Sequence, residues 1–123
     1  MSRVFFYARE QRDTERRLRG VIDVLVPRDE IEVCRSVPEL AQKLGRPKIN
    51  GTRTLVVLVS SSLKDLEDLL SIHDLFDGAF VIMVLPEDDP ESIALAHKMR
   101  SRFITYRASS FADVAGVAAK VLR

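Results

Sequence analysis

The sequence contains a single cysteine, no tryptophan and almost no net charge. The lone cysteine, Cys34, excludes an intramolecular disulfide and is typical of a reducing compartment, so we expect a cytoplasmic protein. The formal net charge of +1 gives no electrostatic reason to expect nucleic acid or an anionic membrane as a partner. No apolar run approaches the roughly 18 residues that a membrane-spanning helix needs, and the N-terminal residues do not have the pattern of a signal peptide.

The motifs of several common activities are also missing. No glycine-rich dinucleotide-binding loop follows the first apolar segment, and no Walker pattern occurs. Ser60 lacks the flanking glycines of a hydrolase nucleophile elbow. Neither His73 nor His97 has a cysteine or a second histidine at zinc-ligand spacing. The sequence therefore predicts no cofactor, no metal site and no enzymatic activity.

The chain does contain a regular alternation of two apolar patterns. Short β-branched or apolar runs predict strands, and apolar residues spaced by three and four predict helices. The predicted strands are 3–8, 31–34, 55–59, 80–85 and 103–106, and the predicted helices are 13–26, 36–45, 62–70, 88–99 and 110–121. Ser36, Ser62 and Ser110 are expected helix caps. A length of 123 residues fits one domain, 1–123, and we expect no output domain after the fifth helix.

The third and fourth predicted strands, 55–59 and 80–85, are apolar without interruption. Continuous rather than alternating apolar residues indicate burial on both faces, as in the middle of a parallel sheet. Alternating strands and helices of these lengths form a parallel sheet with helices on both sides. We therefore predict an α/β fold, a (βα)5 doubly wound parallel sheet of the flavodoxin type, with strand order 2-1-3-4-5.

In such sheets, ligands bind beyond the carboxyl ends of the strands, near the point where the strand order reverses. That point lies between the first and third predicted strands. The candidate site residues are therefore those that leave the strand ends: Ala8, Arg9, Glu10, Arg35, Ser36, Ser60, Ser61, Ser62, Pro86, Glu87, Asp88, Tyr106, Arg107 and Ser109.

In the order of its elements, the whole chain resembles the receiver domain of two-component response regulators. Receivers end their first strand with an acidic pair that holds Mg²⁺ and their third strand with the phosphoacceptor Asp. They end the fourth strand with Ser or Thr and the fifth with Lys. In this chain, the corresponding strand ends lie in the segments RVFFYARE, VVLVSSS, VIMVLPED and ITYRASSF. The resemblance implies a receiver-like fold and a role in signalling.

Ala8 and Arg9 stand where the acidic pair would be, and Glu10 follows at the place of a third acid. Ser60 stands at the acceptor Asp. Mg²⁺ prefers carboxylate oxygens, which neither Ala8 nor Arg9 supplies. A serine cannot form an acyl phosphate. The resemblance therefore implies a degenerate, pseudo-receiver domain that is not phosphorylated on Asp.

The two remaining receiver positions also differ. Leu85 or Pro86 stands at the Ser or Thr, and Arg107 stands near the Lys. A module of this kind works through a protein partner or through self-association as a homodimer. In receivers, the face made of the fourth helix, fifth strand and fifth helix commonly serves this purpose, and here it would include residues 93–102 and the last helix.

Two other hypotheses concern the triple serine. Arg9, Ser60, Ser61, Ser62 and Arg107 could together hold a phosphate or carboxylate, as in a small anion-binding sensor. Alternatively, a serine could be phosphorylated, as in partner-switching anti-sigma-factor antagonists, although the acidic lead-in and glycine of their motif are missing.

The simplest interpretations are structural. Ser62 would only cap the helix that follows it, and Arg9 would either remain in solvent or fill the vacated acidic pocket. In the pocket, its expected partners are Glu10 or Glu87.

Overall fold

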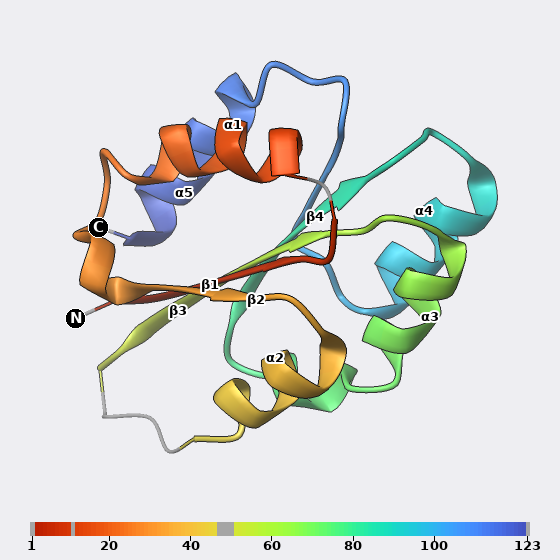
Figure 1. Ribbon diagram of the computed structural model, residues 1–123, viewed down its shortest axis with the longest axis horizontal. Helices are drawn as coiled ribbons and strands as arrows, with labels where there is room; N and C mark the ends of the chain where they lie inside the picture. Colours follow the sequence, from red (N-terminus) through yellow and green to blue (C-terminus); the bar gives the residue numbers. More distant parts are fainter. Residues whose placement is uncertain (1, 11, 47–50, 123) are drawn as a thin grey trace.

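The computed structural model describes residues 2–10, 12–46 and 51–122, and residues 1, 11, 47–50 and 123 lie outside this part (Figure 1). The strands are β1 (Ser2–Ala8), β2 (Ile31–Cys34), β3 (Arg53–Val59), β4 (Phe80–Leu85) and β5 (Phe103–Tyr106). The helices are α1 (Arg12–Ile22), α2 (Val37–Leu44), α3 (Leu63–Leu70), α4 (Pro90–Lys98) and α5 (Ala112–Leu122), with short 3-10 helices at Arg28–Glu30 and His73–Phe76.

All strand pairs are parallel, and the sheet order is β2-β1-β3-β4-β5. The predicted fold class and strand order are therefore confirmed. The register pairs Ala8 with Val59 at the ends of β1 and β3. Consequently, Arg9 and Ser60 leave the sheet at the same level on neighbouring strands.

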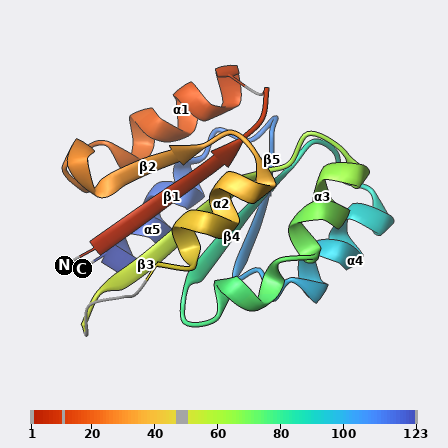
Figure 2. The same cartoon turned by 60° about the horizontal axis from the view of Figure 1, so that its bottom comes forward.

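The sheet separates two layers of helices (Figures 1 and 2). Helices α1 and α5 cover one face, and α2, α3 and α4 cover the other. Alternate residues of each strand enter opposite cores, as Phe5 and Phe6 do in β1. Phe5 packs in the core under α2, α3 and α4, while Phe6 packs under α1 and α5. Burying a side chain of this size contributes about 1.5–3 kcal/mol, so the central strands hold both layers.

Helix α1 ends at Ile22, four residues before the predicted end. The apolar pattern continues to Val26, but the chain turns there, and the Leu25 amide donates to the Ile22 carbonyl at 2.8 Å. Val24 is 81% exposed, whereas Val26 is buried against the core. The apolar spacing of the sequence therefore extends past the end of the helix, because the turn that follows α1 returns Val26 to the core.

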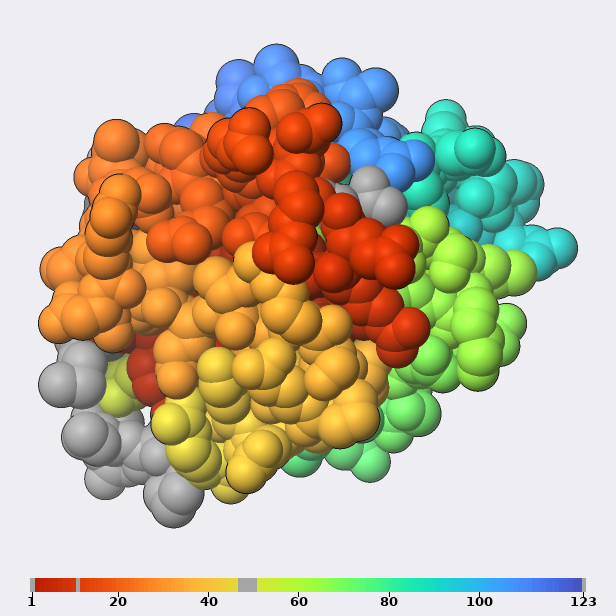
Figure 3. All heavy atoms as spheres, in the orientation of Figure 1, coloured from red at the N-terminus to blue at the C-terminus, as the bar shows by residue number. Residues whose placement is uncertain are grey.

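In the space-filling view, α1 and α2 cover the front of the molecule, beside α3 and α4 (Figure 3).

Two of the three predicted serine caps are confirmed. Ser36 accepts the Glu39 amide and Ser62 accepts the Asp65 amide, each at 3.2 Å. The start of α5 differs, because Phe111 precedes the helix with a φ of 64° and is fully buried. The Ser110 hydroxyl accepts the Ala112 amide, at 3.4 Å. The buried Phe111 side chain sets the entry into α5.

Within residues 2–10, 12–46 and 51–122, no helix has the length and apolar character that a membrane crossing requires.

Candidate functional site

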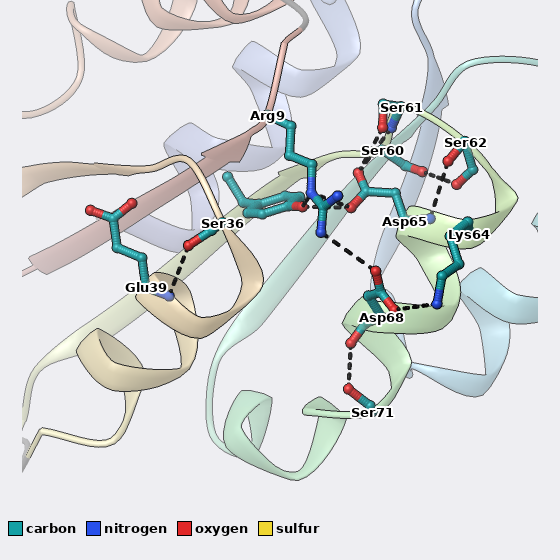
Figure 4. A network of polar contacts seen from close by, with 11 residues as sticks. Arg9, Ser36, Glu39, Ser60, Ser61, Ser62, Lys64, Asp65, Asp68 and Ser71 are labelled. Carbon is teal, nitrogen blue, oxygen red and sulfur yellow. Dashed lines mark hydrogen bonds and ion pairs between the residues drawn. The ribbon is translucent and has the colours of Figure 1, made fainter.

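Arg9 and Ser60 follow the carboxyl ends of the neighbouring strands β1 and β3, and both lie beside the start of α3 (Figure 4). Ser60 is 1% exposed, and its amide continues the sheet by donating to the Val84 carbonyl at 3.0 Å. Ser60 is therefore held as a buried extension of β3 and does not stand on an open loop.

Asp65, in the first turn of α3, is at the centre of the polar contacts between these strand ends. Its side chain is 1% exposed. The Tyr7 hydroxyl donates to its Oδ1 at 2.5 Å, and Arg9 Nε lies 3.3 Å from the same oxygen. Arg9 Nε also donates to the Tyr7 hydroxyl oxygen at 2.8 Å. A buried carboxylate is costly unless it is paired and hydrogen-bonded, and these contacts meet both requirements.

The second oxygen of Asp65 binds Ser61, the middle residue of the triple serine. The Ser61 amide and the Ser61 hydroxyl both donate to Oδ2, each at 3.1 Å. Both carboxylate oxygens are thus used, one by β1 and one by the loop between β3 and α3. The network fixes the end of β1 against the start of α3.

Tyr7 remains a protonated donor in this network. Burial raises the pKa of its hydroxyl, and the neighbouring Asp65 carboxylate raises it further, while Arg9 acts in the opposite direction. The short contact from Tyr7 to Asp65 is accordingly a neutral hydroxyl donating to a carboxylate, which is a strong type of hydrogen bond.

The Arg9 side chain is 41% exposed and lies against Asp65, so its partners differ from those predicted for a pocket position. In place of Glu10 or Glu87, it pairs with Asp65 and, through Nη2 at 3.4 Å, with Asp68. The reason is that α3 passes directly beside the end of β1, whereas Glu10 and Glu87 are both exposed. Figure 4 shows the guanidinium of Arg9 between the two carboxylates of α3.

The three serines have separate local partners. The Ser60 hydroxyl donates to the Ser62 carbonyl at 3.0 Å, and the Ser61 hydroxyl donates to Asp65. Ser62 accepts the Asp65 amide and begins α3, which confirms its predicted role as a cap. The triple serine is therefore a strand-to-helix connection whose hydroxyls are already occupied.

Two other candidate positions, Ala8 and Arg35, contact each other at the ends of β1 and β2. Ala8 is buried, and its carbonyl accepts from Arg35 Nη1 at 3.2 Å. Arg35 is held in turn by an ion pair with the buried Glu15 of α1. This second ion pair connects the carboxyl ends of β1 and β2 to α1.

Leu85 and Pro86 stand at the carboxyl end of β4, the strand next to β3, and Arg107 follows β5 at the edge of the sheet. Leu85 is buried and its carbonyl accepts the Arg107 amide at 2.9 Å, while Pro86 is partly exposed after it. The Arg107 carbonyl accepts from Arg17 Nη1 at 2.9 Å. Of the residues of the anion site proposed from the sequence, Arg9 and Ser61 contact Asp65, and Ser60 and Ser62 lie in the same loop. Arg107 follows β5, which β3 and β4 separate from β1.

The sequence analysis missed Tyr7, Asp65 and Asp68. A polar Tyr7 near the end of an otherwise apolar strand was an available signal, because a buried tyrosine hydroxyl usually finds a partner. Asp65 and Asp68 are three apart on α3 and therefore share a face. Their contact with β1 depends on the packing of α3 and has no local signature.

The described side chains offer little reactive chemistry. In the part of the chain that the structure describes, no three His, Cys, Asp or Glu side chains form a group that could hold a metal ion. Burial raises the pKa of the Cys34 thiol to about 11, with a smaller opposing effect from Lys43. A thiol of this kind is protonated near neutral pH and does not act as a nucleophile.

By sequence, the chain gives no significant match to any protein-family profile or curated protein. Solved structures do match. A CheY-like response regulator receiver domain protein from Methanospirillum hungatei JF-1 superposes with a TM-score of 0.73 and 14% identity, over 99% of this chain and 94% of that chain.

Two further structures agree with this one. The Vibrio cholerae chemotaxis protein CheY4 gives a TM-score of 0.71 at 10% identity, covering 98% of each chain. The phosphorylated cyanobacterial phytochrome response regulator RcpA gives 0.63 at 12% identity, over 98% of this chain and 91% of that chain. The chain therefore has the fold of CheY-like receiver domains, at a sequence identity far too low to establish a shared activity.

Proposed function

We propose that this chain is a non-catalytic signalling or regulatory module with a receiver fold, which acts by binding a protein or a second copy of itself without being phosphorylated on Asp. The observation that carries the proposal is the Arg9 guanidinium, which pairs with the buried Asp65 at the end of β1. A cation therefore stands at the strand end where receivers bind a metal cation.

Two features of the same strand ends support the proposal. Mg²⁺ needs several oxygen ligands, usually with at least one carboxylate, and the Asp65 carboxylate is already bound by Tyr7, Arg9 and Ser61. At the acceptor position, Ser60 is buried and its hydroxyl is hydrogen-bonded within the loop. The likeness to receivers contributes the signalling role by analogy only, because fold does not determine function.

A cytoplasmic location is part of the same proposal. It rests on the lone, buried Cys34 and on the sequence features that indicate a reducing compartment.

Treatment with acetyl phosphate and Mg²⁺, followed by intact-protein mass spectrometry, tests the central claim. We expect no added phosphoryl group under conditions that phosphorylate a receiver domain carrying its acceptor Asp, treated in parallel. A hydroxylamine-sensitive phosphoryl group on this chain would contradict the proposal, because that sensitivity identifies an acyl phosphate.

A serine-regulated partner switch is the second candidate, and the exposure of Ser62 favours it. Ser62 is exposed at the N-terminus of α3, where the helix dipole favours a phosphate group. Incubation with cell lysate and ATP, followed by mass spectrometry of the peptide containing residues 60–62, separates this function from the first. Phosphate on this peptide favours the switch, and an unmodified peptide favours the module that works without phosphorylation.

A further inference from the structure

Helix α1 presents a row of arginines to solvent. Arg12, Arg16 and Arg19 are spaced by four and three residues, so they lie on one face of the helix, away from the buried Thr14 and Leu18. This face contains a shallow groove of about 490 Å³, which we call the α1 groove. In the described part of the chain it is lined by Arg12, Glu15, Arg16, Arg19, Gly20, Asp23 and Arg28.

Three of the four arginines of the α1 groove carry a charge that no neighbour compensates. The side chains of Arg12, Arg16 and Arg28 are exposed, and none of these side chains has a hydrogen bond or an ion pair with the residues that the structure describes. Gly20 leaves the groove open, because a Cβ at this position would meet nothing within 4 Å. The three guanidinium groups are therefore accessible to a partner.

The two acids that line the α1 groove are already paired. Glu15 is 9% exposed and forms an ion pair with Arg35, which follows β2. The Asp23 Oδ1 lies 3.9 Å from Arg19 Nη2. Each acid therefore offsets a different arginine, and the charges of the three unpaired arginines remain. The groove consequently attracts negatively charged groups.

The spacing of the arginines suits a peptide with negative side chains. Arg12 and Arg19 are separated by about two helical turns, which is roughly 10 Å along the axis. Carboxylates that recur every three or four residues on another helix have the same spacing. A guanidinium group binds carboxylate or phosphate oxygens through two parallel hydrogen bonds, and clusters of arginines recognise acidic and phosphorylated peptide motifs in this way.

The surroundings of the α1 groove favour a peptide over a nucleic acid. Asp13 and Asp29 each directly follow an arginine of the groove and are exposed, and Asp23 lies in the groove itself. A nucleic acid carries a charge on every phosphate and would meet these acids, whereas a peptide can place its few charges at the arginines. Among the described residues that line the groove, none is aromatic, so bases have no ring to stack on. The turn after α1 also exposes Val24 to 81%, which offers a peptide an apolar contact.

We propose that the α1 groove docks an acidic peptide segment of a protein partner, whose carboxylate or phosphate groups contact Arg12, Arg16 and Arg28. This inference rests on the proposed function, because it states the chemistry of the protein that the module binds. It places that partner on α1, outside the face made of α4, β5 and α5 that is considered for self-association.

Nuclear magnetic resonance titrations of the ¹⁵N-labelled protein test the proposal with synthetic peptides. One alanine-rich peptide carries three glutamates spaced by four and three residues, a second carries phosphoserine at the same positions, and a third carries glutamine there. In about 0.1 M salt, we expect at least one anionic peptide to bind with a Kd of about 1 mM or lower, with shift changes at Arg16, Gly20 and Asp23. The glutamine peptide should bind at least about tenfold more weakly. The stronger anionic peptide identifies the preferred group.

Two charge reversals assign the binding to the α1 groove. Arg16→Glu places a negative charge in the middle of the arginine row, and we expect it to weaken binding of the anionic peptides at least about tenfold. Arg100→Glu makes the same change at an exposed residue after α4, on the other face of the sheet. It should change the Kd less than about twofold, because charges beyond about 10 Å are largely screened in this salt. Circular dichroism checks that both variants are folded.

The proposal is overturned if neither anionic peptide binds, if the glutamine peptide binds as well as they do, or if the shift changes lie outside α1 and the turn after it. It is also overturned if Arg100→Glu weakens binding as much as Arg16→Glu does, or if an oligouridylate of the same charge binds more tightly than both anionic peptides. These results are separate from the acetyl phosphate experiment, in which only an acyl phosphate on this chain contradicts the proposed function.

Discussion

Asp65 connects the end of β1 to the start of α3 through side chains that are far apart in sequence. It accepts from Tyr7, which is 58 residues away, and from Ser61 in the preceding loop, while Arg9 supplies the positive charge. Removing one partner of a buried, paired charge is costly, because the remaining groups keep their desolvation penalty without their contacts. Asp68 differs, since its carboxylate is 31% exposed and pairs with Arg9 and Lys64 at the surface.

This difference gives a prediction at the scale of single residues. Asp65→Ala should lower the free energy of unfolding by about 3 kcal/mol, whereas Asp68→Ala should lower it by at most about 1 kcal/mol. Urea unfolding of the two variants measures both values. Equal losses would contradict the central role of Asp65, because both substitutions remove one carboxylate from the same helix face.

The sequence predicted the positions of these residues better than their contacts. Arg9 and Ser60 were expected at adjacent strand ends, and the parallel register places them there. The partners of Arg9 were predicted wrongly, because Glu10 and Glu87, which follow the ends of β1 and β4, are both exposed. Which carboxylate reaches Arg9 depends on how closely α3 approaches β1, and no local pattern encodes that distance.

At the scale of elements, helix starts with a capping side chain were predictable and helix ends determined by packing were not. Ser36 and Ser62 cap α2 and α3 as expected, because the cap is a contact over three residues. The end of α1 and the start of α5 were missed. The first depends on a turn that returns Val26 to the core, and the second on the buried Phe111.

The cap of α3 provides the element-scale prediction. Ser62→Ala should lower the free energy of unfolding by about 1 kcal/mol, because it removes the acceptor of the Asp65 amide. Ser62→Asp should retain most of the stability, since Asp is an equally good cap. Chemical denaturation monitored by circular dichroism gives the three values for comparison.

Ser71 provides the matched control for this helix. Its hydroxyl donates to the Asp68 carbonyl at the exposed end of α3, at 2.6 Å. Ser71→Ala should change the free energy of unfolding by no more than about 0.5 kcal/mol. If Ser71→Ala is as destabilising as Ser62→Ala, the loss reflects hydroxyl removal in general and not the loss of the cap.

At the scale of the whole molecule, strand order and layering followed from a few strong patterns. The uninterrupted apolar residues of β3 and β4 placed them in the centre of a parallel sheet, and the remaining strands then had few possible positions. Function is encoded differently. It depends on which side chains stand at the strand ends and on which surface of the domain binds a partner. The pattern of buried residues gives no information about either.

The proposed self-association can be tested with two glycines in comparable places on neighbouring helices. Gly116 of α5 and Gly20 of α1 are both exposed, and a Cβ added at either would meet nothing within 4 Å. An arginine at either position should therefore leave the monomer folded. If copies meet through α4, β5 and α5, Gly116→Arg places a bulky charge in the interface, whereas Gly20→Arg does not.

Size-exclusion chromatography with light scattering measures the result across a range of protein concentrations. We expect the unsubstituted chain and Gly20→Arg to form dimers at high concentration, and Gly116→Arg to remain monomeric, because a charge buried at an interface without a partner is strongly unfavourable. If Gly20→Arg disrupts the dimer and Gly116→Arg preserves it, the interface lies on the α1 side of the domain instead. A chain that is monomeric at every concentration would remove self-association from the proposal and leave a different protein as the partner.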